Sequence, residues 1–178
     1  MDPYLFVSKI QECEPTVEEM IKFGLSKEEA SSALTERVAK KREKKLELGD
    51  NDILFELFSL FEMGSIRVGM IEFLSKPLER EETYIIAKVD IDWIILDTKE
   101  KKIYLENGED GSKIFSCAIN SDSFLSALSV AACFLSRCSL NTELARNQEE
   151  KLKIVDECAE LAGGKEYWDF YAYLVGID

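Results

Sequence analysis

Carboxylates in the middle of the chain are the residues whose types and spacing could support chemistry. They occur in the stretch VDIDWIILD and in the LENGEDG that follows it. Clustered carboxylates can bind Mg²⁺ or Ca²⁺, or act as an acid–base pair. If Asp90 and Asp92 share a strand, they project from the same face, because side chains alternate along a strand. The candidate residues are Asp90, Asp92, Asp97, Glu106, Glu109 and Asp110.

The same stretches also fit a solvated sheet without a reactive centre. Apolar residues from Val89 to Ile95 alternate with Asp90 and Asp92, which is the pattern of a half-exposed strand. NGEDG lacks the ligand order of a calcium loop and has no phosphate-binding glycine pattern, so it is expected to be a hairpin turn. A metal-dependent hydrolase using Asp90, Asp92 and Asp97 remains an alternative. No metal or cofactor is predicted.

Histidine and cysteine usage narrows the chemistry further. The chain has no histidine, which excludes serine–histidine and cysteine–histidine catalysis and removes the commonest transition-metal ligand. Its 5 cysteines are odd in number and have no CxxC spacing, so neither a disulfide framework nor a zinc site is expected. Most of them have apolar neighbours and are predicted to be free, buried hydrophobes. Cysteine usage of this kind fits the cytoplasm, and the sequence contains no evident catalytic set.

The charge is strongly negative and unevenly distributed. The net charge is −13, of which −2 falls in residues 1–50 and −11 in residues 51–178. Such a field repels nucleic acid and anionic lipid and speeds encounter with basic proteins. The start, MDPYLFVSKIQECEPT, has no basic segment before an apolar one, and no apolar run reaches about 18 residues, so neither a secretory signal nor a membrane span is predicted. The same charge also fits a protein whose acids serve only its solubility, since many cytosolic proteins are acidic.

The first 49 residues are predicted to form an N-terminal helical extension. DPYLFVSKIQEC has helical spacing of its apolar residues, and SKEE at Ser26–Glu29 is a capping box. The helix that this box starts is predicted to run to Leu48 and stop at Gly49. Its basic end, Arg37–Lys45, has no interleaved aromatic residues and is flanked by acids, so we expect a solvated helix end rather than a nucleic-acid site.

Residues 50–178 are predicted to form the main domain, in the order helix, strands, helices. NDILFELFSLFEMG has an Asn or Asp cap and an apolar face, and the long run TYIIAKVDIDWIILD should turn near Val89–Asp92. Two further helices are expected in NSDSFLSALSVAACFLSRC and TELARNQEEKLKIVDECAELAGG, and the aromatic tail should pack back on the sheet as a short helix. The fold class is therefore α+β, with an antiparallel sheet of about four to five strands and helices on one side.

The order of these elements from Asp50 to Arg137 resembles the SUKH superfamily of bacterial immunity proteins, which also includes yeast regulators of cell-wall synthesis and some viral proteins. The similarity rests on a strand with an acid and bulky residues, DWIILD, then KIYL after a polar turn. The closing segment AINSDSFLSAL, in which an asparagine–serine cap leads into a helix, is also similar. The chain departs from the family in the turn, where DTKEKK replaces the usual glycine.

The resemblance implies a non-enzymatic, SUKH-like α+β protein that binds a toxin domain and blocks its active site. Many such toxins are nucleases with basic faces, and an acidic sheet edge or turn would mimic phosphate. The six carboxylates named above are then predicted to contact the partner rather than to react. The alternative within the same family is a regulatory or scaffold protein of the cell-wall-regulator type without a toxin partner. The oligomeric state is open, as is the question of whether residues 1–49 pack on the main domain.

Overall fold

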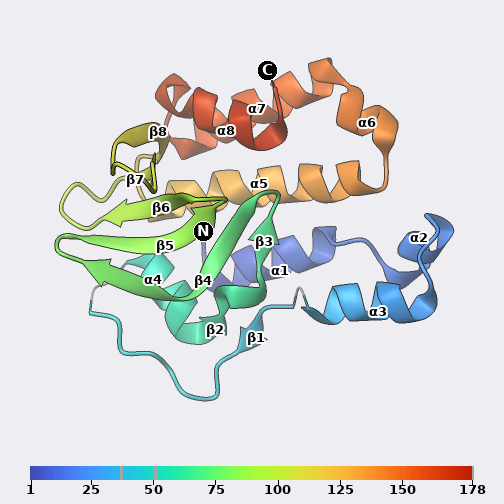
Figure 1. The fold of residues 1–178 in the computed structure, drawn as a ribbon, viewed down its shortest axis with the longest axis horizontal. Helices are drawn as coiled ribbons and strands as arrows, with labels where there is room; N and C mark the ends of the chain where they lie inside the picture. The colour runs from blue at the N-terminus through green and yellow to red at the C-terminus, as the bar shows by residue number, and fades with distance from the viewer. Residues whose placement is uncertain (37, 50–51, 178) are drawn as a thin grey trace.

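A computed structural model describes residues 1–36, 38–49 and 52–177, and confirms the predicted α+β class (Figure 1). An antiparallel six-stranded sheet has the strand order β3-β4-β5-β6-β7-β8, and a two-stranded sheet pairs β1 (Lys40–Lys41) with β2 (Phe61–Glu62). The strands of the large sheet are β3 (Arg67–Val68), β4 (Ile71–Arg80), β5 (Thr83–Val89), β6 (Asp92–Asp97), β7 (Ile103–Glu106) and β8 (Lys113–Ala118). The helices are α1 (Pro3–Cys13), α2 (Val17–Lys22), α3 (Lys27–Glu36), α4 (Ile53–Leu60), α5 (Ser121–Ser139), α6 (Thr142–Arg146), α7 (Gln148–Ala162) and α8 (Trp168–Val175).

The large sheet is a meander in which every strand pairs with its neighbours in sequence. The predicted turn near Val89–Asp92 is confirmed, since Val89 pairs with Asp92 across a two-residue loop. The sheet has one strand more than expected, because the stretch IRVGMIEFL folds into two strands rather than one. Gly69, with φ +56°, allows the tight turn that separates β3 from β4.

The main core lies between the inner face of the sheet and the helices behind it (Figure 1). Helix α5 runs through this core, and the predicted asparagine cap is confirmed, because Asn120 Oδ1 accepts a hydrogen bond from the amide of Ser123 (2.8 Å). Asp52 caps α4 through the amide of Leu54 (2.9 Å), whereas Asn51, the other predicted cap, lies outside the described residues. The aromatic tail forms α8, where Phe170 and Tyr171 are fully buried as expected.

The N-terminal helix is part of the same core. Phe6, Val7 and Ile10 of α1 are buried and pack with the side chains of the sheet and of α5. This answers the question that the sequence left open for this part of residues 1–49. Helices α2 and α3 pack on each other and bury Met20 and Ala30, which do not belong to the main core cluster.

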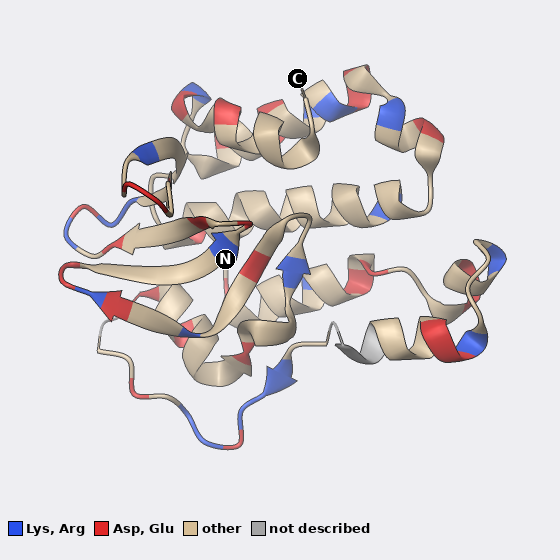
Figure 2. Cartoon of the chain, in the orientation of Figure 1, with Lys and Arg blue, Asp and Glu red and all other residues tan. Residues whose placement is uncertain are grey.

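The helix predicted from Ser26 to Leu48 is correct only in its first half. The capping box is present, with Ser26 N to Glu29 Oε2 at 2.9 Å, but α3 ends at Glu36. Arg42 then donates to the carbonyl oxygens of Phe58 (2.9 Å), Phe61 (3.1 Å) and Ser75. These long-range hydrogen bonds favour an extended segment around Arg42. A helix there would place several cationic side chains next to one another. Figure 2 shows the resulting line of Lys and Arg along β1 and the loop after it; Arg37, also in the predicted basic end, lies outside the described residues.

The predicted helix TELARNQEEKLKIVDECAELAGG is divided into α6 and α7 at Asn147, which caps α7 through the amide of Glu150 (3.1 Å). The buried face of α7 consists of Val155, Cys158, Ala159 and Ala162. Leu152 and Leu161, apolar residues of this segment, are 43% and 40% exposed.

The prediction that the cysteines are free is wrong for one pair. Cys13 at the end of α1 and Cys133 in α5 form a disulfide with a Cα–Cα separation of 5.0 Å. Cys117, Cys138 and Cys158 are free, and of these Cys117 and Cys158 are buried as expected. The pair was missed because the two cysteines are 120 residues apart and nothing local to either indicates a partner.

The sheet is bent toward its outer face, the face turned away from α1, α4 and α5. Register shifts interrupt β4 between Phe73 and Leu78, and β5 between Ile85 and Ala87, and such bulges bend strands. Arg80 in β4 consequently reaches Glu106 in β7, with Nη1 and Oε1 2.7 Å apart. In a flat sheet these two strands lie about 14 Å apart, so the contact requires the β4–β5 hairpin to curl over the outer face.

Among the described helices, none combines the length and the apolar character needed to cross a membrane.

Candidate functional site

The turn between β5 and β6 presents an acid and an apolar residue together. Asp90 and Ile91 form this two-residue turn, so Asp90 does not lie on a strand with Asp92. Asp90 has φ +55°, in the left-handed region that Asp and Asn tolerate better than most side chains. Ile91 is 57% exposed, which makes it the most exposed large hydrophobic side chain of the described residues.

The turn between β7 and β8 is stabilised by its own polar side chains. Asn107 Oδ1 accepts hydrogen bonds from the amides of Glu109 (2.8 Å) and Asp110 (3.2 Å). Asp110 Oδ1 accepts from the amide of Ser112 (2.9 Å). The hydrogen bonds from Ser112 lower the pKa of Asp110 from its ordinary value, so this carboxylate stays charged at lower pH than a free one. The expected hairpin turn is therefore present and is held by hydrogen bonds to its own side chains.

The two turns contact each other. The amide of Gly108 donates to Asp92 Oδ1 (3.0 Å), and a Cβ built on Gly108 would lie 1.9 Å from the carbonyl oxygen of Ile91. Only glycine allows this approach. The contact brings four predicted residues to one end of the sheet, around Ile91. We refer to Asp90, Ile91, Asp92, Glu109 and Asp110 as the acidic turn pair.

The structure places Asp97 at the other end of β6. Its Oδ1 accepts from the amides of Lys99 and Glu100, both at 2.8 Å, and so fixes the turn into β7. That turn is mixed in charge, with Lys102 paired to Glu100 (3.3 Å). Asp97 is therefore not brought together with the acidic turn pair.

Glu106 is the only acidic side chain that the described residues bury, at 5% exposure. It lies on the outer face opposite Trp93 and is paired with Arg80, which is itself about half-exposed. A buried carboxylate of this kind needs its arginine, because without it an uncompensated charge would be left in the interior, and it offers little surface to a partner. Nothing local in the sequence KPLEREE identified Arg80 as its partner.

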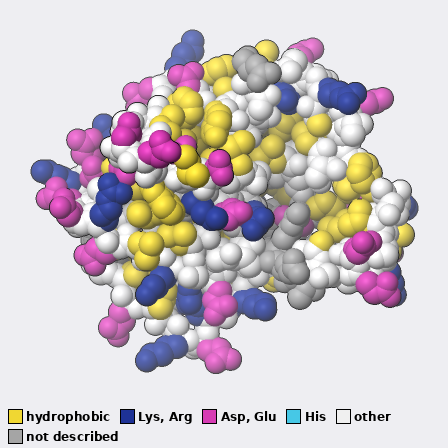
Figure 3. All heavy atoms as spheres, viewed as in Figure 1, with side chains coloured by type: hydrophobic (Ala, Val, Ile, Leu, Met, Phe, Trp, Pro, Cys, Tyr) yellow, Lys and Arg dark blue, Asp and Glu magenta, His cyan; other side chains and the backbone are white. Residues whose placement is uncertain are grey.

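The outer face beside this ion pair is amphipathic. Ile95 is fully buried there, because its cross-strand neighbours Ile85 and Tyr104 and the bent end of β4 cover it. Burial, followed by the charge of Glu106, raises the pKa of Tyr104, and Lys113 Nζ lies 5.5 Å from the centre of its ring. Figure 3 looks onto this side and shows hydrophobic side chains over β4 and β5, bordered by charged ones.

The carboxylates do not converge as the hydrolase alternative requires. Asp92 and Asp97 begin and end a six-residue strand, which spans about 17 Å, so they cannot share one ion with Asp90. Across residues 1–36, 38–49 and 52–177, no group of three or more His, Cys, Asp or Glu side chains could hold a metal ion.

Sequence reasoning missed two residues on which the acidic turn pair depends. Gly108 allows the two turns to touch, and Ile91 is an apolar side chain at the tip of a turn. The dipeptide NG indicates a tight turn at Gly108, so the turn itself was expected. The contact of Gly108 with Ile91 was not, because it joins two separate hairpins and has no local signal in the sequence.

Comparison with known proteins adds no further constraint: no family model, no curated protein and no solved structure matches this chain.

Proposed function

We propose that this chain is a non-enzymatic binding protein of the SUKH immunity type, which docks its acidic turn pair on a basic face of a toxin domain and blocks it. The observation that carries this proposal is the contact between the two turns, which gathers Asp90, Asp92, Glu109 and Asp110 around an exposed isoleucine. Neither turn contains a lysine or arginine. Rigid, preorganised acids lose little entropy on binding.

The overall charge also favours a positively charged partner. Residues 51–178 carry −11 of the net −13, so the field around the sheet attracts a cationic protein and repels nucleic acid. Ile91 adds an exposed apolar side chain next to these acids, and an apolar side chain that becomes buried on binding can contribute much of the affinity. A basic toxin domain fits both features.

The test compares the wild-type chain with D90N/D92N/E109Q/D110N. These substitutions remove four charges but keep the oxygen acceptors that fix the turns, so the fold should be unchanged. The matched control, E18Q/E28Q/E43Q/E47Q, removes the same charge from exposed acids on α2, α3 and the segment after β1. Binding partners are captured from the native host at low salt, identified, and titrated calorimetrically.

We expect the wild type and the control to capture a basic protein that is toxic when expressed alone and harmless when co-expressed with this chain. At about 7 Å in water each of four charge pairs contributes about 0.6 kcal/mol, so the turn variant should bind about 25-fold more weakly at 10 mM salt and about fivefold at 150 mM. Equal binding by the turn variant would contradict this surface. A captured partner that is not a toxin would favour the regulatory alternative.

A further inference from the structure

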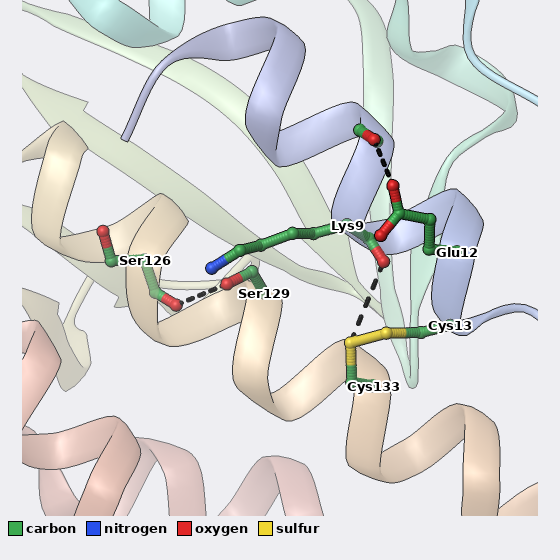
Figure 4. The surroundings of a disulfide bond; sticks show 7 residues. Lys9, Glu12, Cys13, Ser126, Ser129 and Cys133 are labelled. Carbon is green, nitrogen blue, oxygen red and sulfur yellow. Dashed lines mark hydrogen bonds between the residues drawn. A yellow bond between two sulfur atoms is a disulfide. The ribbon is translucent and has the colours of Figure 1, made fainter.

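The Cys13–Cys133 disulfide joins the N-terminal helix to the central helix (Figure 4). Met1 pairs with Asp122 at the start of α5, and Cys13 is bonded to Cys133 further along it, so α1 runs beside α5 in the same direction. Phe6, Val7 and Ile10 are already buried in the main core. The docking of α1 therefore has a large noncovalent component, and the covalent bond acts at its last residue.

The bond lies at the root of a separate structural unit. Beyond Cys13 the chain enters α2 and α3, which pack on each other and stand to one side of the sheet in Figure 1. We call these two helices, Val17–Glu36, the helical arm. The arm rejoins the body at Ala39, which is buried, and at β1, which pairs with β2. Cys13 thus anchors the chain just before the arm, and Ala39 and β1 anchor it just after the arm.

The disulfide is accessible to a reagent. Neither of its cysteines is buried, and Cys13 lines an open hollow of about 580 Å³ between the arm root and the end of α5. The residues facing it across the hollow include Ser136, Arg137 and Leu140. Access of this kind is required for thiol–disulfide exchange.

The three free thiols are disfavoured as disulfide partners of Cys13 or Cys133 because they are poor nucleophiles. Burial raises the pKa of Cys117, raises that of Cys158 to about 12, and raises the pKa of Cys138. A thiol that stays protonated near neutral pH is a slow nucleophile. Oxidation of this chain therefore has one favoured product, the Cys13–Cys133 bond.

We propose that Cys13 and Cys133 form a reversible thiol–disulfide switch that clamps the helical arm to α5 when oxidised and releases the arm when reduced. The reductant is a dithiol, small or protein-borne. It breaks the S–S bond, donates two electrons and two protons to give Cys13–SH and Cys133–SH, and becomes a disulfide itself. Oxidation by a disulfide of the same class reverses each change. The sheet and the acidic turn pair keep their structure in both forms.

The experiment compares hydrogen exchange of the oxidised and reduced chain, prepared with oxidised and reduced dithiothreitol and checked by peptide mapping. We expect exchange in residues 14–36 to be at least tenfold faster in the reduced form, with no change in residues 71–106. C13S/C133S should match the reduced form in both buffers. C138S, which removes a free cysteine from the same helix, should keep the response.

Three results would overturn the switch. Peptide mapping of the oxidised chain could find Cys13 and Cys133 unlinked, or the arm could exchange equally fast in both forms. Faster exchange throughout the sheet on reduction would show that the disulfide stabilises the whole fold rather than the helical arm alone. The wild-type comparison distinguishes these outcomes even if C13S/C133S fails to fold.

Discussion

The bent outer face of the sheet makes a sharp prediction about Ile95, a residue that a flat half-exposed strand would leave in solvent. Ile95 is fully buried outside the main core cluster, beneath the bent end of β4 and the Arg80–Glu106 ion pair. Replacing it with alanine removes three carbons from a packed site. The change therefore measures how firmly the β4–β5 hairpin closes over this face.

The size of the effect follows from what surrounds the side chain. Truncation of a buried isoleucine to alanine lowers the free energy of unfolding by about 2–5 kcal/mol. The neighbours Ile85 and Tyr104 are themselves only partly buried, so the site can relax, and we expect I95A to cost about 2–3 kcal/mol, in the lower half of that range. In a domain of this size that loss lowers the melting temperature by about 5–10 °C.

The assay is urea unfolding at neutral pH without added thiol, so that the disulfide is the same in every sample. I91A is the matched control, because Ile91 is 57% exposed and its truncation should change stability by no more than about 0.5 kcal/mol. I94A, on the inner face, should cost more than I95A, since Ile94 is fully buried in the main core. A loss below about 1 kcal/mol for I95A at an unchanged denaturant slope would refute the closed hairpin.

Two further substitutions test other packed positions. G108A should separate the acidic turn pair and lower stability by about 1–3 kcal/mol, because its Cβ would lie 1.9 Å from the carbonyl oxygen of Ile91, whereas G111N, at φ +73° in open space, should be tolerated in the same unfolding assay. Y171F removes a buried hydroxyl that has no hydrogen-bond partner among the described residues, so stability at pH 7 should stay equal or rise by about 1 kcal/mol. Because burial raises the pKa of Tyr171 well above its ordinary value, the unfolded phenol ionises first, and stability present below pH 10 is lost as the pH rises further. Y171F should lose less stability between pH 9 and pH 11, and an equal loss would contradict this assignment.

Local signals in the sequence were sufficient where the stabilising contacts are themselves local. The capping box at Ser26–Glu29, the asparagine cap at Asn120 and the turn at Asp90–Ile91 each depend on residues within a few positions of one another. Turn formers and caps act through backbone groups of their own segment, so their positions can be predicted without knowledge of the fold.

The predictions failed where contacts between distant segments decide the structure. The basic run after Glu36 has helical composition, yet Arg42 binds carbonyl oxygens 16, 19 and 33 residues away. The disulfide joins residues 120 apart, and the curl of the sheet depends on Arg80 reaching across two strands to Glu106. None of these partners is marked by periodicity or spacing, because each depends on how the completed elements pack.

The candidate site shows the same division. The sequence identified six candidate acids from their residue type and position. Only four of them belong to the acidic turn pair, because that surface forms through contacts between separate hairpins. Asp97 resembles Asp92 in sequence, since both lie at an end of the same strand, but it stabilises a turn at the opposite end of the sheet. Glu106 follows the same strand pattern and is buried by an arginine that the sequence did not indicate.

In the acidic turn pair, the carboxylates that carry the charge also fix the geometry. Asp92 accepts the amide that joins the two turns, and Asp110 accepts the amide of Ser112 within its own turn. Alanine at either position would remove charge and turn support together, so a loss of binding could not be assigned to either. The substitutions D92N and D110N keep an acceptor oxygen at each position, so they separate charge from turn support. Because each of these carboxylates is bonded inward through one oxygen, its orientation is fixed and its other acceptor sites are left for the proposed basic partner.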